Sequence, residues 1–133
     1  MNRFIIFAPV ISVLAGCAGS SYEQIDGKRV YFDYDSAEIS NDARKELTGI
    51  AAIMKRNADI GIVVEGNADA RGSQEYNAAL GALRAGNAAH IIMKDGVDAK
   101  RIKTVSYGKD KPSAQGNTEE AYRENRNATI VVK

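Results

Sequence analysis

Residues 64–85 read VEGNADARGSQEYNAALGALRA. An apolar strand ends in this stretch, a polar loop bounded by glycines follows, and a long helix begins. Because a strand and a helix hold such a loop still, α/β proteins often place their ligand contacts at this kind of joint. The loop carries Asp69 and Arg71, and the helix carries Arg84. The joint is therefore the middle of the expected fold and the first place to look for a site.

A carboxylate and a guanidinium at this joint allow two interpretations. They could hold a zwitterion, with the carboxylate taking an ammonium and the guanidinium taking a carboxylate through two hydrogen bonds. They could also form a structural Asp–Arg ion pair. Spacing alone favours the ion pair, because ion pairs are commoner than ligand sites.

Apolar patterning along the rest of the chain predicts four strands and three helices. We expect strands at residues 30–33, 60–65, 102–107 and 128–132. We expect helices from the N-cap Ser40 to about residue 57, from Ser73 to about residue 95, and from a possible N-cap at Asn117 to about residue 125. The order β-α-β-α-β-(short α)-β predicts an α+β fold, with a mixed four-stranded sheet that carries its helices on one face.

Two of these elements carry more detailed expectations. Residues 60–65 are nearly continuously apolar, which is typical of a central strand covered on both faces. Gly81 and Gly86 should each cost the second helix about 1 kcal/mol relative to alanine. The same helix presents an apolar stripe that we expect to be buried, made of Tyr76, Leu80, Leu83 and Ile91.

The first twenty residues read MNRFIIFAPVISVLAGCAGS. The apolar run after Arg3 is about 11 residues long, too short for a membrane span, which needs about 20. The run ends in Leu-Ala-Gly-Cys, which resembles a bacterial lipobox, and Cys17 is the only cysteine in the chain. In lipobox proteins the cysteine is lipidated and becomes the first mature residue. The alternative is an ordinary secretory signal with a chance cysteine.

We therefore predict a signal peptide over residues 1–16, a lipidated Cys17 followed by a short polar tether to residue 29, and a globular domain over residues 30–133. Lipid chains contribute about 0.8 kcal/mol per buried methylene, so an acylated N-terminus would hold a membrane firmly. Ala18 stands where an aspartate favours retention in the inner membrane of enteric bacteria. By analogy with that sorting rule, we expect the outer membrane.

The composition argues against several classes of function. The formal net charge is +1, and the basic residues form no cluster with aromatic residues between them, so nucleic acid is not an expected partner. No set of residues with the spacing of a metal or cofactor site is visible. His90, the only histidine, lies near the apolar stripe of the second helix, where a packed or surface role is far commoner than a ligand role.

An enzyme remains an alternative at this stage, as a cell-wall hydrolase that uses the carboxylates of Asp69 and Glu65. No Ser/His/Asp set or cysteine nucleophile supports it, so we expect no catalytic residues. A third possibility is an envelope scaffold whose main partners are proteins.

Several separated blocks match one family. They are VYFDYD at 30–35, VEGNADARGS at 64–73, EYN at 75–77, LG at 80–81, RA at 84–85, SYGK at 106–109, AY at 121–122 and NR at 125–126. Over roughly residues 30–133 the chain resembles the OmpA-like peptidoglycan-binding domain. The resemblance implies a two-layer sandwich of sheet and helices, and it changes the balance between the two interpretations of the Asp–Arg pair.

The resemblance implies a binding site for the diaminopimelate residue of the peptidoglycan stem peptide. Asp69 would take its side-chain ammonium, and Arg84 would take its side-chain carboxylate. Tyr34 and Asp35 would add contacts, partly through backbone amides, and Asn77 would shape the site. Lipid-anchored members of the family work with Tol proteins, so TolB-like and TolA-like partners are also implied.

The chain departs from the family pattern at three positions. Asn67 stands where a histidine is usual, and it would line the site as an uncharged donor and acceptor. Leu83 stands where an arginine is frequent, and Asn127 where a second arginine often follows Arg126. None of these removes Asp69 or Arg84, but each bears on the shape of the pocket or on the partner surface.

Overall fold

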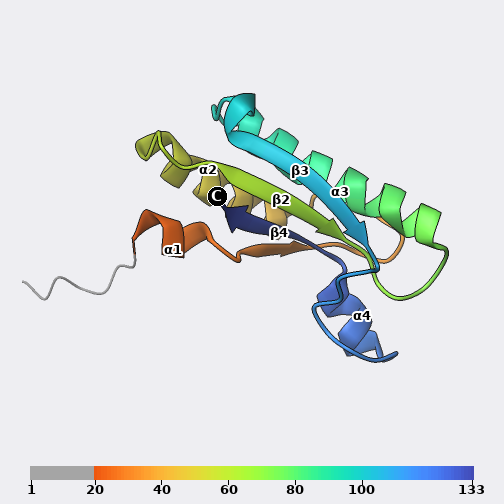
Figure 1. Cartoon of the computed structure of the whole chain (residues 1–133). Helices are drawn as coiled ribbons and strands as arrows, with labels where there is room; N and C mark the ends of the chain where they lie inside the picture. Colours follow the sequence, from red (N-terminus) through yellow and green to blue (C-terminus); the bar gives the residue numbers. More distant parts are fainter. Residues whose placement is uncertain (1–19) are drawn as a thin grey trace, which may run out of the picture.

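The computed structural model describes residues 20–133, which form one mixed four-stranded sheet with helices packed against it (Figure 1). The strands are β1 (Arg29–Tyr31), β2 (Ile62–Asn67), β3 (Ile102–Gly108) and β4 (Asn127–Val132). The helices are α1 (Ser21–Ile25), α2 (Asn41–Arg56), α3 (Gln74–Lys94), the 3-10 helix η1 (Ala99–Arg101) and α4 (Glu119–Asn125). The predicted signal peptide and the lipidated Cys17 lie outside the described residues.

The strands follow the order β1-β4-β2-β3. β2 and β3 are parallel and are joined by α3, whereas β4 is antiparallel to both β1 and β2. The short helix α4 provides the turn that sends β4 back through the middle of the sheet. The predicted fold class, the mixed sheet and the element order are therefore confirmed, with α2 and α3 along one face (Figure 1).

Strand β2 is central, but only one of its faces is covered. Ile62 and Val64 point to the helices and are fully buried, whereas Val63 and Glu65 point the other way and are only half-buried. The prediction of cover on both faces is wrong, because no helix crosses the second face within residues 20–133. Long side chains shield it instead: Lys111 lies 3.5 Å from the Glu65 carboxylate and 4.6 Å from the centre of the Tyr107 ring.

The predicted stripe on α3 is half wrong. Leu80 and Ile91 are buried, but Tyr76 is 48% exposed and Leu83 is 58% exposed. The buried surface is instead made of smaller residues and one arginine, namely Asn77, Gly81, Arg84, Ala85, Ala88, Ala89 and Ile92. The helix is turned toward this slim surface because its backbone comes very close to β2.

That approach depends on two glycines that face each other, Gly66 on β2 and Gly81 on α3. A Cβ added to Gly66 would overlap the Gly81 carbonyl group, and one added to Gly81 would overlap the Ser106 hydroxyl and lie 2.9 Å from the Gly66 oxygen. The Ser106 hydroxyl also donates to the Ala78 carbonyl at 2.7 Å. Gly81 is thus a condition for the packing of α3, and the contact fixes the separation of α3 from the end of β2.

The segment expected to be a polar tether is in part folded. Residues 21–25 form α1, capped by Ser20, and Ile25 is fully buried in the core. Asp26 then accepts a hydrogen bond from the Val132 amide at 2.9 Å, and Gly27 donates to the Ile130 carbonyl at 2.7 Å. A single buried isoleucine in a short helix leaves no periodic signal, which is why patterning missed it. The folded domain thus begins near residue 21.

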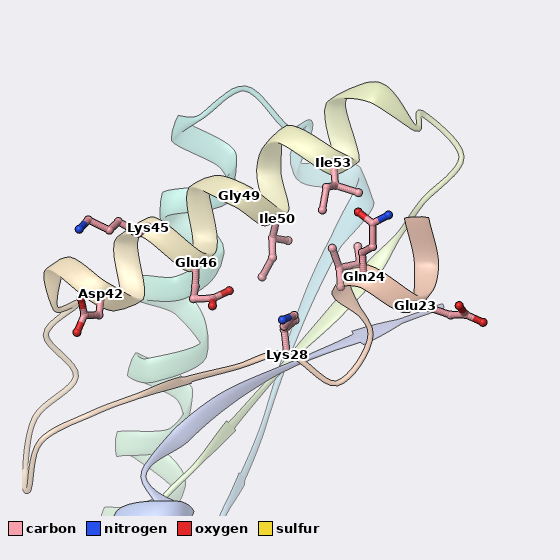
Figure 2. Close-up of a pocket in the computed structure, with 10 residues that line it drawn as sticks. Glu23, Gln24, Lys28, Asp42, Lys45, Glu46, Gly49, Ile50 and Ile53 are labelled. Atoms are coloured by element: carbon pink, nitrogen blue, oxygen red, sulfur yellow. The ribbon is translucent and has the colours of Figure 1, made fainter. Parts of the chain in front are cut away.

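A groove of about 770 Å³ lies between α1 and α2 (Figure 2). Its apolar floor includes Ile25, Ile50 and Ile53, and charged side chains such as Glu46 and Lys28 stand at its rim. None of the predicted site residues lines it. Within residues 20–133, no helix is both long enough and apolar enough to cross a membrane.

The remaining differences concern element ends. β1 ends at Tyr31, and β2 begins at Ile62, because Ile60 closes a turn by donating its amide to the Asn57 carbonyl at 3.1 Å. The cap of α4 is Thr118, whose hydroxyl accepts from the Ala121 amide at 3.1 Å. The predicted cap at Asn117 is one residue too early.

Candidate functional site

A small pocket lies where three segments meet, at the carboxyl end of β2. The loop after β1, the loop after β2 and the first turns of α3 close around a space of about 70 Å³. It is lined by Tyr34, Asp35, Asp69, Arg71, Gly72, Tyr76, Asn77, Leu80 and Arg84. The fold therefore brings together five of the six residues that the sequence assigns to the site.

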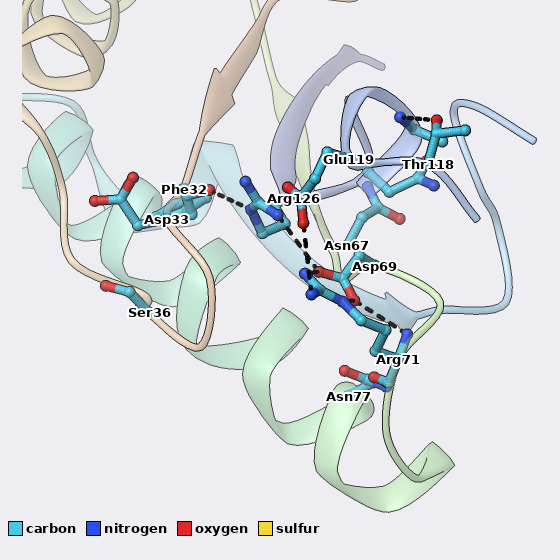
Figure 3. A network of polar contacts seen from close by, with 12 residues as sticks. Phe32, Asp33, Ser36, Asn67, Asp69, Arg71, Asn77, Thr118, Glu119 and Arg126 are labelled. Atoms are coloured by element: carbon cyan, nitrogen blue, oxygen red, sulfur yellow. Dashed lines mark hydrogen bonds and ion pairs between the residues drawn. The ribbon is translucent and has the colours of Figure 1, made fainter. Parts of the chain in front are cut away.

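Asp69 is the buried carboxylate of this pocket, and it is only 5% exposed. Its oxygens accept hydrogen bonds from the Arg71 backbone amide at 3.0 Å, from Nε at 3.1 Å and from Nη2 at 2.8 Å (Figure 3). Arg126 Nη1 lies 3.6 Å away. Burial alone would raise the pKa of the Asp69 carboxyl, but the hydrogen bonds from Arg71 and the charges of Arg71 and Arg126 outweigh it and lower the pKa. The group is a carboxylate at neutral pH.

Arg71 lies at the mouth of the pocket. Its guanidinium lies over two aromatic rings, 4.4 Å from the centre of Tyr34 and 4.2 Å from that of Tyr122. Such cation–π contacts are worth about 0.5–1 kcal/mol at exposed sites. The backbone is held separately, because Asn77 Nδ2 donates to the Arg71 carbonyl at 2.7 Å. The Asp69–Arg71 ion pair is the contact that spacing alone favoured.

Arg84 is the buried cation of the pocket, with no exposed surface. Its Nε donates to the Ser36 carbonyl at 2.9 Å, Nη1 to the Asn67 carbonyl at 2.9 Å and Nη2 to the Asp33 carbonyl at 3.1 Å. Because a guanidinium carries five N–H groups, two remain for other partners. Burial lowers the pKa of Arg84 to about 10, against the opposing charge of Asp69, so the side chain stays cationic at neutral pH.

The OmpA family model matches residues 31–126, which include every element that builds this pocket. The chain belongs to the OmpA family. The peptidoglycan-associated lipoprotein of Pasteurella multocida is 34% identical, and the alignment covers 98% of this chain and 97% of that protein. The peptidoglycan-associated lipoprotein of Agrobacterium fabrum is 43% identical over 80% of this chain, which spans only 60% of that relative's length.

Solved structures agree on the fold of this OmpA-family domain. The crystal structure of the peptidoglycan-associated lipoprotein from Burkholderia pseudomallei superposes with a TM-score of 0.78 at 36% identity, over 80% of this chain and 90% of that one. The C-terminal domain of Helicobacter pylori MotB superposes with a TM-score of 0.74, but at 23% identity it is evidence for the fold alone. The resemblance to the OmpA-like domain is therefore confirmed.

Asn67 is the one predicted site residue that does not line the pocket. Its side chain points to β4, where Nδ2 donates to the Asn127 Oδ1 at 3.0 Å. Only its backbone serves the site, as an acceptor for Arg84. Two departures from the OmpA-family pattern, at positions 67 and 127, are thus in contact with each other. Leu83, the third departure, is exposed and does not line the pocket.

Two residues near the pocket were given no role by the sequence, Tyr122 and Arg126. Arg126 is 7% exposed and donates Nε to the Phe32 carbonyl at 2.9 Å, while its Nη1 has no hydrogen-bond partner within the described residues. Both residues come from α4 and its end, which reach the site only because β4 pairs with β1 and β2. Both residues lie in blocks of sequence that match the OmpA family. This match did not reveal that Tyr122 contacts Arg71 or that Arg126 lies near Asp69.

Proposed function

We propose that this chain is an outer-membrane lipoprotein that binds peptidoglycan non-covalently through diaminopimelate, as a peptidoglycan-associated lipoprotein of the Tol–Pal system. The observation that carries the proposal is the pairing, in one small pocket, of a buried carboxylate with a buried guanidinium, Asp69 and Arg84. The names of the relatives support the ligand class. The pocket lining holds no serine, cysteine or histidine, which supports a binding site rather than a catalytic one.

The pocket suits the end of a side chain rather than a whole stem peptide. Its volume of about 70 Å³ is roughly that of two water molecules in the liquid. The ammonium of diaminopimelate would pair with Asp69, and the carboxylate would take the free N–H groups of Arg84. Tyr34, 64% exposed, would cover the methylene chain. Because both charges are free only on uncrosslinked stems, the site would select them.

The loop that carries Tyr34 is preformed for such contacts. Asp35 has a φ of 53°, a left-handed conformation that is uncommon outside glycine and best tolerated by aspartate and asparagine. Arg84 holds this loop through the Asp33 and Ser36 carbonyls. Residues in sparsely populated backbone conformations are frequent at ligand sites, and both Tyr34 and Asp35 line the pocket.

The fold would also present the site to the cell wall. The Val132 amide at the end of β4 donates to Asp26 beside α1, whereas β4 starts next to Arg126, which lies near Asp69, so α1 and the pocket are at opposite ends of the sheet (Figure 1). A six-residue strand spans about 20 Å. Four Cα–Cα steps join Cys17 to Ser21 and reach at most about 15 Å. The domain would thus stay against its membrane with the pocket on the far side.

A sacculus-binding assay tests the function. The protein starting at Ala18 should sediment with diaminopimelate-containing sacculi, should be released by free diaminopimelate, and should bind poorly to sacculi that contain lysine instead. It should release no soluble muropeptides, whereas a hydrolase would. Equal binding to both kinds of sacculi would contradict the proposal and favour an envelope scaffold, for which cross-linking to TolB-like and TolA-like proteins is the direct measurement.

A second test concerns the membrane. Replacing Cys17 with serine removes the proposed lipid attachment, and residues 20–133 offer no helix that could span a bilayer. The variant should move from the outer-membrane fraction to the soluble periplasm in cells treated to degrade peptidoglycan. If it stays with the membrane in high salt, lipid on Cys17 is not the anchor.

A further inference from the structure

The Asp69 carboxylate, which is the proposed acceptor for a ligand ammonium, is already occupied by a residue of the same chain. Arg71 places three N–H groups on it, two of them from the guanidinium at 2.8 and 3.1 Å. Both carboxylate oxygens are engaged. An incoming ammonium must therefore take the place of the Arg71 side chain or share the carboxylate with a second cation.

The surroundings allow the side chain to leave without disturbing the loop. The loop backbone is fixed by Asn77, which donates to the Arg71 carbonyl at 2.7 Å, and by Lys109, whose Nζ donates to the Gly72 carbonyl at 2.7 Å. The Arg71 side chain itself is 35% exposed. Displacement thus needs only a change of side-chain rotamer.

A second partner is in place for the displaced guanidinium. Glu119, at the start of α4, has a carboxylate oxygen 3.8 Å from Arg71 Nη1 and a side chain that is 64% exposed. The rings of Tyr34 and Tyr122 both contact the guanidinium. A small shift of the guanidinium over these rings would exchange Asp69 for Glu119 while the cation–π contacts persist.

We propose that Arg71 is an internal competitor for the ammonium site: it satisfies Asp69 in the free protein and moves to Glu119 when the ligand binds. This inference rests on the proposed function, since it names the specificity of the same pocket. Arg71 would stabilise the buried carboxylate until the wall is reached. It would also exclude weakly binding amines and inorganic cations, because a ligand must bind the Asp69 carboxylate more favourably than a guanidinium that makes two hydrogen bonds to it.

The direction in which Arg71→Gln changes the Kd of the ligand tests the proposal. Arg71→Gln should lower the Kd for a diaminopimelate stem tripeptide by about tenfold or more, because hydrogen bonds to charged groups are worth about 1.5–3 kcal/mol and 1.4 kcal/mol is tenfold. Glu119→Gln should raise the Kd, because it removes the second partner. Arg123→Gln is the control for Arg71→Gln. It makes the same charge change on an exposed face of α4, and it should leave Kd nearly unchanged.

Calorimetry on these variants separates the outcomes. Weaker binding by Arg71→Gln would overturn the inference and make Arg71 a ligand contact. Tighter binding by Arg71→Gln, or binding by this variant alone, would support it. If neither wild type nor Arg71→Gln binds, the proposed function and the inference both fail. As a positional readout, the Arg71 Nε–H resonance in ¹⁵N NMR should move on ligand addition in wild type, and an unchanged resonance at saturation would contradict displacement.

Discussion

Gly66→Ala is expected to destabilise the domain by about 3 kcal/mol or more, at the upper end of the range for overpacked cores. The added Cβ would overlap the carbonyl group of Gly81 and lie 3.1 Å from the Ala85 Cβ. Because the first obstacle is backbone, no side-chain rotation can relieve it, and α3 must move away from β2. Gly66 does not have a positive φ, so the loss would report the contact alone and not a strained conformation.

Gly86→Ala is the control, on helix α3, which packs against Gly66. A Cβ added there has nothing within 4 Å, and φ is not positive. Alanine is better than glycine inside a helix by about 1 kcal/mol, so this variant should be more stable than wild type. Urea unfolding followed by circular dichroism measures both. If Gly66→Ala unfolds within about 0.5 kcal/mol of wild type, the close approach of α3 to β2 is not real.

Two glycines of α3 separate the local and tertiary components of the sequence analysis. Gly81 and Gly86 are equivalent in helix propensity, and the sequence alone assigned both the same cost. The structure separates them, because one faces the sheet and the other faces solvent. A property that depends on which surface a helix buries cannot be obtained from propensity, and the same error placed Leu83 in the core.

Two of the three predicted helix caps, which have local causes, were predicted correctly. Ser40 and Ser73 each cap a helix as expected, with hydroxyls that accept from Ala43 and Tyr76 amides at 3.1 Å. These contacts span three residues and need no tertiary information. In contrast, burial of Ile25 and the approach of Arg126 to Asp69 depend on pairing β4 with distant segments, and no local pattern contains that.

The site was predicted in part, because some of its features are local and others depend on tertiary contacts. The sequence placed Asp69 and Arg84 at one joint, and the family resemblance added Tyr34, Asp35 and Asn77, all of which line the pocket. It could not show that Arg84 holds three backbone carbonyls, or that Arg71 covers Asp69. These contacts change how the site must be tested, because removing Arg84 would also release the loop at Asp33 and Ser36.

The pairing of Arg84 with the ligand carboxylate is therefore best tested by changing the ligand. Amidating the side-chain carboxylate of diaminopimelate in a stem peptide should weaken binding to wild type at least tenfold, because it removes a charge-assisted contact worth about 1.5–3 kcal/mol. A lysine stem, which lacks the same carboxylate, should behave alike. Asp69→Asn should also bind at least tenfold more weakly, since it leaves the ammonium without a counter-charge.

The two halves of the zwitterion should then respond separately. In Arg84→Ala, amidation should have little further effect, whereas in Asp69→Asn it should still cost about tenfold, because that variant keeps the arginine. Calorimetry with three stem peptides on these variants gives a double-mutant cycle, and circular dichroism selects the variants that fold. A coupling energy near zero between Arg84 and the amidated carboxylate would contradict the assignment. The expected pattern instead has strong coupling to Arg84 and none to Asp69, which only two separate charge contacts would produce.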